Sequence, residues 1–320
     1  MSQSSFAETF LPQHFGRNDR LEKIAGLLDW SRIEALVRKV RPGDHGRPPY
    51  AALSMFKALL LQQWYGLSDP GLEEALRDRF SFVRFCGFVL DRDLPDETTL
   101  CRFRNALKDN GLGEQLFAEI GRQLDASGFI VREGTLVDAT LIASAVRAPP
   151  AGSSPLHIES SNPLDPDANW TRRGKGRHLF FGYKAHIGVD QGSGLIRSRQ
   201  LTGAKTYESV VADALIMGDE KAVYADKAYE KKERRLALKA RGAKDRIQHR
   251  RHKYQASLPH WQTVRNILIG RVRSAVERVF SQFKGIYGLT RMRYRGIKAN
   301  AFHLDLVAIA YNLNRGARLT

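Results

Sequence analysis

The sequence has few cysteines and no long apolar run. Cys86 and Cys101 are the only two cysteines among its 320 residues, and neither lies near another thiol or near histidines at a metal-ligand spacing. Free thiols in a reducing compartment are therefore expected, and a disulfide-stabilised fold is not. Apolar stretches such as residues 304–313 are interrupted by polar residues and are too short to span a bilayer. The first residues also lack the basic and apolar segments of a secretory signal, so a cytoplasmic globular protein is expected.

Acidic residues are scarce in the last third of the chain. Residues 227–320 contain 23 lysines and arginines but only 5 acids, a net charge of +18, whereas residues 1–226 carry a net charge of −1. A cationic segment of this kind favours a polyanionic partner, because binding releases the counterions of phosphate groups. The charge alone does not distinguish DNA from a ribosomal partner or a membrane surface.

Helical patterns dominate residues 1–125. One helical segment is expected over 20–40, and a second helix begins after Pro49 and ends at Gly66. Asp96 is a suitable N-cap for a later helix. Short helices joined by tight turns fit a DNA-binding bundle and a helical docking domain about equally well.

After Gly128 the pattern becomes that of a mixed α/β layer. Strands are expected at 135–142, 180–190, 195–203, 221–229 and 246–250. Helices are expected at 207–218, 230–241, 261–288 and 301–315. The polar segment 147–178, rich in proline, glycine and serine, is expected to be a long loop. Antiparallel strands followed by a strand and helices indicate a mixed sheet flanked by helices.

Two of the expected strands carry a single carboxylate in an apolar run. They are Asp138 in LVDATLI and Asp226 in VYADKAY. Aspartate is unfavourable in strands and in an apolar interior, so each side chain must be hydrogen-bonded, paired with a cation or bound to a metal. Either residue alone is more simply structural, but two on separate strands point to a shared site.

A third carboxylate lies on the expected C-terminal helix. At 100° per residue, Arg273, Glu277 and Lys284 share one stripe that borders the apolar face of this helix. Glu277 can therefore point toward strands that the helix covers. The alternative is an exposed ion pair between Arg273 and Glu277, which are one turn apart. Glu277 is, however, the only acid between Asp245 and Asp305, in a strongly cationic region.

Three converging carboxylates predict a metal site. Such groups repel one another unless cations lie between them. Oxygen ligands without a histidine or cysteine cluster suit Mg²⁺ or Mn²⁺ better than zinc. Two such ions activate a nucleophilic oxygen and stabilise the leaving oxygen in phosphodiester displacement. Together with the cationic segment, Asp138, Asp226 and Glu277 therefore predict phosphoryl transfer on nucleic acid.

Several motifs resemble one known family. The segments VDAT, GYKAHIGVD and YADKAYE, and the spacing Arg273-x₃-Glu277-x₆-Lys284, are similar to those of the DDE transposases of bacterial insertion sequences, most closely the insertion-sequence 5 group. FVRFCGFVLDRDLPDETTLCRFRNAL and LDPDANWTRRGKGRHLFFGYKAH resemble segments of the same group. The likeness extends over roughly residues 45–315. One departure is Gly270, which stands where family members usually have a tyrosine that contacts the DNA end.

The resemblance implies a fold and a domain order. Residues 126–320 would form an α/β catalytic domain with an RNase H-like mixed five-stranded sheet flanked by helices. Residues 1–125 would form a small all-helical domain for DNA binding or dimerisation. The protein would act in the bacterial cytoplasm, associated with the nucleoid.

The resemblance also implies a reaction. The enzyme would bind the terminal inverted repeats of its insertion sequence, cleave the ends and join the 3′-hydroxyl to target DNA. Asp138, Asp226 and Glu277 would be both catalytic and metal-binding, with Mg²⁺ as the cofactor and Mn²⁺ as its substitute. Arg273 and Lys284 would contact DNA phosphates near the scissile bond. Double-stranded DNA would be the partner of a homodimer or larger assembly, since two ends must be held together.

Five further residues are candidates for DNA contacts. Lys184 and His186 are two residues apart on an expected strand and share one face, which is turned either to the DNA and the site or to solvent. Arg291, Arg293 and Arg295 alternate with Met292 and Tyr294. This pattern suits phosphate contacts along an extended segment and equally suits a solvated basic turn.

The sequence allows two roles for each of two tryptophans. Trp170 and Trp261 are expected to pack, as most tryptophans do. The alternative is that they stack on an unpaired base near a cut DNA end.

Two other functions are compatible with the same residues. An RNase H-like nuclease would use the same carboxylates and metals but would hydrolyse DNA without joining it. A non-catalytic, domesticated DNA-binding protein would keep the cationic surface. The three intact carboxylates argue against this last possibility.

Overall fold

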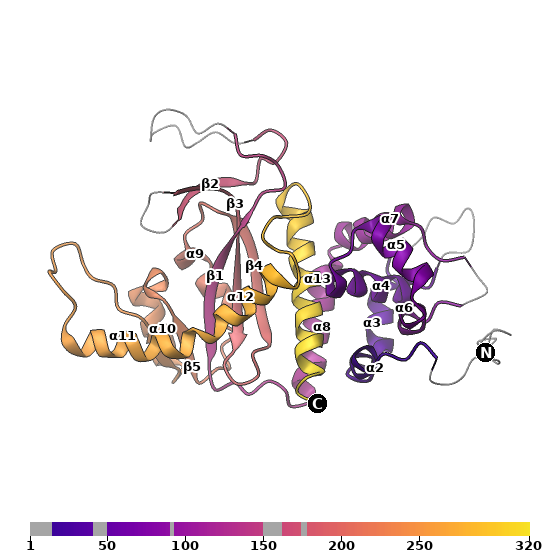
Figure 1. The fold of residues 1–320 in the computed structure, drawn as a ribbon. Helices are drawn as coiled ribbons and strands as arrows, with labels where there is room; N and C mark the ends of the chain where they lie inside the picture. The colour runs from indigo at the N-terminus through magenta and orange to yellow at the C-terminus, as the bar shows by residue number, and fades with distance from the viewer. Residues whose placement is uncertain (1–14, 41–49, 90–92, 150–161, 174–177) are drawn as a thin grey trace. The chain divides into compact units, whose positions relative to one another are not determined.

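The chain forms two compact units, described here from a computed structural model (Figure 1). The structure describes residues 15–40, 50–89, 93–149, 162–173 and 178–320. One unit comprises Met1–Ser127 with Asp305–Thr320, and the other comprises Gly128–Leu304. The division lies close to the expected one, except that the last residues of the chain belong to the first unit. None of the described helices is both long and apolar enough to cross a membrane.

The described residues of the first unit form helices and no strand, as expected. Its helices are α2 (Asp19–Gly26), α3 (Trp30–Val37), α4 (Ala52–Tyr65), α5 (Asp69–Asp78), α6 (Phe80–Cys86), α7 (Glu97–Asp109), α8 (Leu112–Ala126) and the end of α13 (Ile297–Gly316). Asp96 caps α7 through a hydrogen bond from the Thr99 amide, and Gly66 ends α4 in the left-handed conformation. The single helix expected over 20–40 is instead two helices, because Asp29 caps a new one at Trp30.

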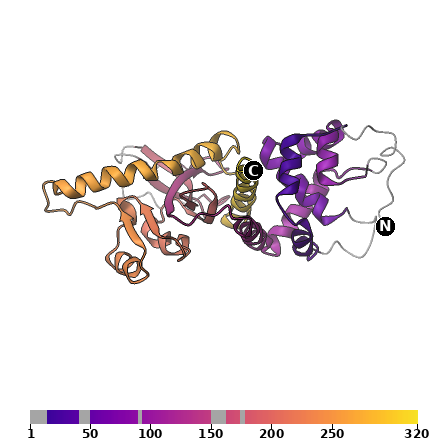
Figure 2. The same ribbon diagram turned by 90° about the horizontal axis from the view of Figure 1, so that it is seen from below.

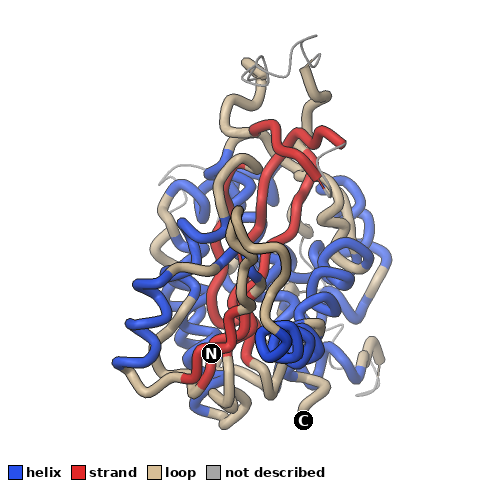
Figure 3. The backbone as a smooth tube through the Cα atoms, turned by 90° about the vertical axis from the view of Figure 1, so that its left-hand side faces the viewer, coloured by secondary structure: helices blue, strands red, loops and turns tan. Residues whose placement is uncertain are grey.

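The second unit contains a six-stranded mixed sheet. Its strands are β1 (Thr135–Ala143), β2 (Asn169–Arg173), β3 (His178–Asp190), β4 (Ile196–Gly203), β5 (Ala222–Ala225) and β6 (Lys244–Ile247). β3 pairs antiparallel with β1, β2 and β4, whereas β5 pairs parallel with β1 and β6. The order β4-β3-β1-β5-β6 is the expected RNase H-like five-stranded sheet, and Figure 3 shows its strands side by side. β2 is an addition that the expected loop over 147–178 missed.

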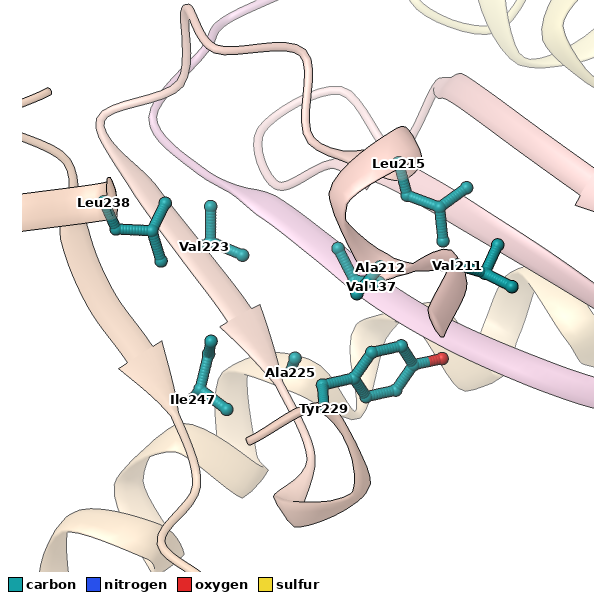
Figure 4. Close-up of a cluster of buried hydrophobic side chains, with 9 residues drawn as sticks. All are labelled: Val137, Val211, Ala212, Leu215, Val223, Ala225, Tyr229, Leu238 and Ile247. Carbon is teal, nitrogen blue, oxygen red and sulfur yellow. The ribbon is translucent and has the colours of Figure 1, made fainter. Parts of the chain in front are cut away.

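Helices cover both faces of this sheet (Figures 1 and 2). α9 (Glu208–Leu215) and α10 (Lys232–Ala240) contribute side chains to one apolar cluster with β1, β5 and β6 (Figure 4). The cluster contains Val137, Val211, Ala212, Leu215, Val223, Ala225, Tyr229, Leu238 and Ile247. α11 (His260–Arg273) packs on β5 and α12 (Ala275–Gly285) packs on β1, on the other face.

The helix expected over 261–288 is interrupted at Ser274. The Ser274 hydroxyl donates to the Arg271 carbonyl at 2.7 Å, and the Glu277 amide donates to the Ser274 carbonyl at 3.1 Å. Serine bonding back to the preceding turn locally disturbs a helix. α11 and α12 nevertheless run almost in line (Figure 2), so Arg273 and Glu277 stay on neighbouring turns.

Candidate active site on the sheet

The parallel pairing of β1 with β5 brings two of the predicted carboxylates to one level of the sheet. Leu136 pairs with Tyr224, and Asp138 and Asp226 each follow two residues later. Val137 packs into the cluster with α9. Because side chains alternate along a strand, Asp138 points to the opposite face, which α11 and α12 cover.

Asp226 lies just beyond the end of β5 and not within a strand. Its backbone is extended, and its side chain accepts a hydrogen bond of 2.7 Å from the Ala228 amide. This bond caps a short 3₁₀ helix, Lys227–Tyr229. Asp226 therefore sits at the carboxyl end of the strand, where the chain leaves the sheet and a side chain can reach a ligand.

Glu277 lies in the first turn of α12 and is exposed. α12 packs on β1, and the negative charge of Glu277 is felt at Asp138. In the described residues, however, no three histidine, cysteine, aspartate or glutamate side chains are gathered closely enough to hold a metal ion. The backbone thus brings the three carboxylates toward one region, with their side chains not yet gathered around a common point.

Arg273 occupies one oxygen of Asp138. Its Nη1 lies 2.5 Å from Oδ2 of Asp138, and the two side chains are 20% and 18% exposed. The other oxygen of Asp138 accepts from the Ala139 amide at 2.9 Å. Arg273 therefore pairs with Asp138 on β1 and not with Glu277, which lies one turn away on the same helical stripe.

The carboxylate of Asp138 is destabilised in its charged form. Burial raises the pKa of Asp138 to about 6, and the charges of Asp226 and Glu277 act in the same direction. Arg273 and the Ala139 amide oppose this rise without cancelling it. Burial therefore disfavours the charged form of Asp138 even with the guanidinium in place.

Two of the predicted DNA contacts are not on the surface. His186 is fully buried, its Nε2 lies 2.9 Å from the Thr202 hydroxyl oxygen, and burial lowers its pKa to about 4. Lys184 is 7% exposed and is held by Glu208 at 2.6 Å and by the Thr206 carbonyl at 2.8 Å. The DNA-free structure presents neither side chain to a ligand, because His186 is enclosed and Lys184 is paired with Glu208, and their DNA contacts stay a prediction. α9, which carries Glu208, covers the face of β3 that alternation alone left undecided.

The arginines after α12 are exposed, as a phosphate-binding segment requires. Arg291, Arg293 and Arg295 are all exposed, whereas Met292 between them is 3% exposed. The segment extends along the end of β1, where Ala143 donates to the Thr290 carbonyl and accepts from the Met292 amide. Lys284 is partly exposed on α12.

Tyr229 is a residue near the site that sequence reasoning missed. It is 1% exposed, and among the described residues its hydroxyl has no hydrogen-bond partner. Burial raises the pKa of Tyr229, and the charges of Asp138, Glu208 and Asp226 raise it further. The motif YADKAYE holds the only signal, an aromatic residue three positions after Asp226.

An apolar recess of about 620 Å³ lies beside α11. Its lining comprises Tyr224, Arg246, His260, Trp261, Val264, Arg265, Leu268, Ile269 and Val272. Trp261 is 60% exposed and packs only on one side, against the His249 ring with centroids 5.3 Å apart. Trp170 is partly buried and packs against Phe181 with ring centroids 5.4 Å apart.

Two family models match the chain. One is a Transposase domain (DUF772) over residues 10–106, and the other is a Transposase DDE domain over residues 131–313. A cryo-EM structure of the piggyBac transposase synaptic complex with hairpin DNA is similar with a TM-score of 0.46 and 11% identity, over 94% of this chain and 73% of that chain. That likeness is too distant to support an argument about function. The DDE model spans more than half of the sequence, and the chain therefore belongs to the DDE transposases, enzymes that cleave DNA and transfer its strands.

Proposed function

We propose that Asp138, Asp226 and Glu277 are the catalytic residues with which this transposase cleaves the ends of its insertion sequence and joins the freed 3′-hydroxyl to target DNA. The shared register of Asp138 and Asp226 on β1 and after β5 carries this proposal. It is supported by α12, which packs on β1 and bears Glu277 in its first turn. All three residues also lie within residues 131–313, which the Transposase DDE domain model matches.

The donor set suits a divalent metal ion, on which DDE transposases depend. We propose Mg²⁺, with Mn²⁺ as a substitute, since all three donors are carboxylate oxygens. When bound, such ions activate the attacking oxygen and stabilise the leaving oxygen of a phosphodiester. Burial raises the pKa of Asp138 to about 6, and a bound cation would favour the charged form of this carboxylate. Asp138 must first release Arg273.

The cations around this site then bind the DNA backbone. Arg273, once released from Asp138, presents its guanidinium beside the carboxylates, where a scissile phosphate would lie. Lys284 follows on the same helical stripe, and the segment bearing Arg291, Arg293 and Arg295 lies at the end of β1. Phosphate contacts of this kind position the DNA and make its binding depend on salt.

We propose that the partner is double-stranded DNA, which the protein binds both as the transposon end and as the target. A homodimer or larger assembly holds the two ends, and the helical first unit serves DNA binding or dimerisation at the bacterial nucleoid. Sizing the protein with and without end DNA tests the assembly. One monomer bound for each pair of ends would contradict it.

A strand-transfer assay tests the reaction. Pre-cleaved duplexes carrying the inverted repeats that flank the reading frame are incubated with Mg²⁺ and a target plasmid. Joined product is expected with the wild type and is expected to disappear in Asp138→Asn, Asp226→Asn and Glu277→Gln. Asp219→Asn, a carboxylate paired with Arg132 and Arg197, is the matched control that keeps activity. Cleavage without joining would indicate a nuclease. If the protein catalysed neither cleavage nor joining, it would be a DNA-binding protein without catalytic activity.

A further inference from the structure

Another carboxylate, that of Asp165, lies near the far end of β1. It is fully buried and accepts hydrogen bonds from the Ser144 hydroxyl, the Tyr183 hydroxyl and, at 2.8 Å, the Gly296 amide. Among the described residues no lysine or arginine forms an ion pair with it. A buried carboxylate needs hydrogen-bond donors, and the position of these donors shows which parts of the fold Asp165 joins.

The donors to Asp165 come from three distant parts of the sequence. Ser144 follows β1, Tyr183 is on β3, and Gly296 ends the arginine segment, which we define as Arg291–Arg295. Gly296 has a φ of +77°, a left-handed conformation in which few side chains are tolerated. Asp165 thus ties the catalytic sheet to the end of the arginine segment.

The arginine segment is held at both of its ends. At its start, the Ala143 amide donates to the Thr290 carbonyl at 3.1 Å, and the Met292 amide donates to the Ala143 carbonyl at 2.7 Å. At its far end, Asp165 accepts from Gly296, and Asp167 accepts from the Ile297 amide at 2.8 Å. The two aspartates therefore also satisfy amides at the start of α13.

The middle of the segment is braced by one side chain. Asn300, which is fully buried, accepts from the Tyr294 amide at 3.1 Å and donates to the Tyr294 carbonyl at 2.8 Å. With both ends and Tyr294 held, the backbone is ordered while Arg291, Arg293 and Arg295 stay exposed. An ordered segment loses less conformational entropy when its side chains bind.

We propose that Asp165 is a positioning residue for DNA. It holds the backbone of the arginine segment in one conformation at the end of β1, so that three guanidinium groups are preorganised for the phosphates of the strand that reaches Asp138. The proposal rests on the proposed function, because it takes the arginine segment to be a phosphate site. It adds a role for the LDPDANW motif, which contains Asp165 and Asp167.

Asp190 offers a matched control for Asp165. It too is a fully buried aspartate of the same sheet, and it accepts hydrogen bonds from the amides of Arg132 and Ser193 at 2.9 Å each. It lies at the end of β3 that pairs with the start of β1, away from the arginine segment. Asp165→Asn and Asp190→Asn therefore make the same chemical change in comparable surroundings.

Two measurements on the full-length protein test the proposal. The first is binding to a 30-base-pair duplex of random sequence over a series of salt concentrations. Asp165→Asn is expected to bind at least about tenfold more weakly with an unchanged salt slope, because the contacts persist but the segment must be ordered first. The second is limited trypsin digestion read by mass spectrometry, in which new cleavage after Arg291, Arg293 and Arg295 is expected. Asp190→Asn is expected to lose stability but to keep wild-type affinity and protection.

Either of two results would overturn the proposal. One is wild-type affinity of Asp165→Asn despite cleavage in the segment, which would make its order irrelevant to DNA. The other is an equal loss of affinity in Asp190→Asn, which would mean that general destabilisation is responsible. Thermal unfolding of both variants verifies that they are folded during the binding measurement.

A third variant separates this proposal from the proposed function. Replacing Arg291, Arg293 and Arg295 together by glutamine is expected to lower the salt slope by up to about 2.7, or about 0.9 for each phosphate that the variant no longer neutralises. Wild-type binding by this variant would remove the basis for a role of Asp165. Strand transfer by the wild type would still stand in that case, because it is measured separately.

Discussion

Asp138 and Asp190, two aspartates of the paired strands β1 and β3, are buried in contrasting ways. Asp190 is fully buried and accepts hydrogen bonds from the amides of Val131, Arg132 and Ser193 and from the Ser193 hydroxyl. Asp138 receives one amide bond from its own neighbour and is otherwise held by a single guanidinium. One carboxylate is fixed by the backbone, and the other by a side chain that can move.

The difference separates a structural group from a reactive one. Backbone amides at Asp190 cannot leave without unfolding the turn, so that carboxylate stabilises the fold and binds nothing else. At Asp138 burial raises the pKa to about 6, with Asp226 and Glu277 acting in the same direction. Shifted pKa values of this kind cluster at functional sites. The predictions below test the contrast, beginning with the largest effect.

Asp138→Asn is expected to abolish strand transfer, with a loss on the order of 10³-fold or more, because the carboxylate acts together with its partners on the metal. The metal-free protein is expected to be at least as stable as the wild type at pH 7, since asparagine avoids burying a charge whose pKa is raised. Strand-transfer rates and urea unfolding measure the two effects. A large loss of stability would place Asp138 in the same class as Asp190.

His186 lies on β3 next to Ile187, the residue that pairs with Asp138, and its titration must be separated from that of the two aspartates. Burial lowers the pKa of His186 from 6.5 to about 4, so the fold favours the neutral ring. Its contribution is fully present above pH 6.5 and is lost as the pH falls from 6.5 toward 4, by on the order of 3 kcal/mol. Urea unfolding across this range is expected to show the loss in the wild type and a flatter profile in His186→Gln. An identical slope in both would assign acid unfolding to the carboxylates.

Asp190→Asn is expected to destabilise the protein by about 2 kcal/mol, because one of the two oxygens becomes a donor that faces other donors. Urea unfolding at pH 7 measures the change. Strand transfer by the folded fraction is expected to be that of the wild type. A loss of activity beyond the loss of folded protein would break the contrast with Asp138.

The sequence predicted the carboxylates better than it predicted their surroundings. Asp138 and Asp226 stand out because aspartate is unfavourable in a β-rich apolar run, and that signal is local. The two aspartates lie at the same position along neighbouring strands because Leu136 pairs with Tyr224, and no local sequence pattern encodes this pairing. The partner of Arg273 was equally hidden, because a helix projection indicates Glu277 one turn away and not an acid on a distant strand.

Burial was the other quantity that local patterns left open. Alternation placed Lys184 and His186 on one face of β3 but did not say that this face is covered. A single serine such as Ser274 does not by itself predict the end of a helix, so the sequence did not indicate the interruption between α11 and α12. The strand β2 lies in a polar segment and forms only by pairing with β3. Each of these features depends on tertiary contacts.

Arg273→Gln gives the smallest effect and tests whether the guanidinium competes with metal for Asp138. With the ion pair removed, the affinity of the DNA-free protein for Mn²⁺ is expected to rise by about tenfold, because binding no longer requires Arg273 to be displaced. Isothermal titration calorimetry measures this directly. Arg278→Gln removes the same charge from an exposed position on α12 and controls for the general field. An equal rise in Mn²⁺ affinity in both variants would show that Arg273 acts only through the general field and does not compete with the metal for Asp138.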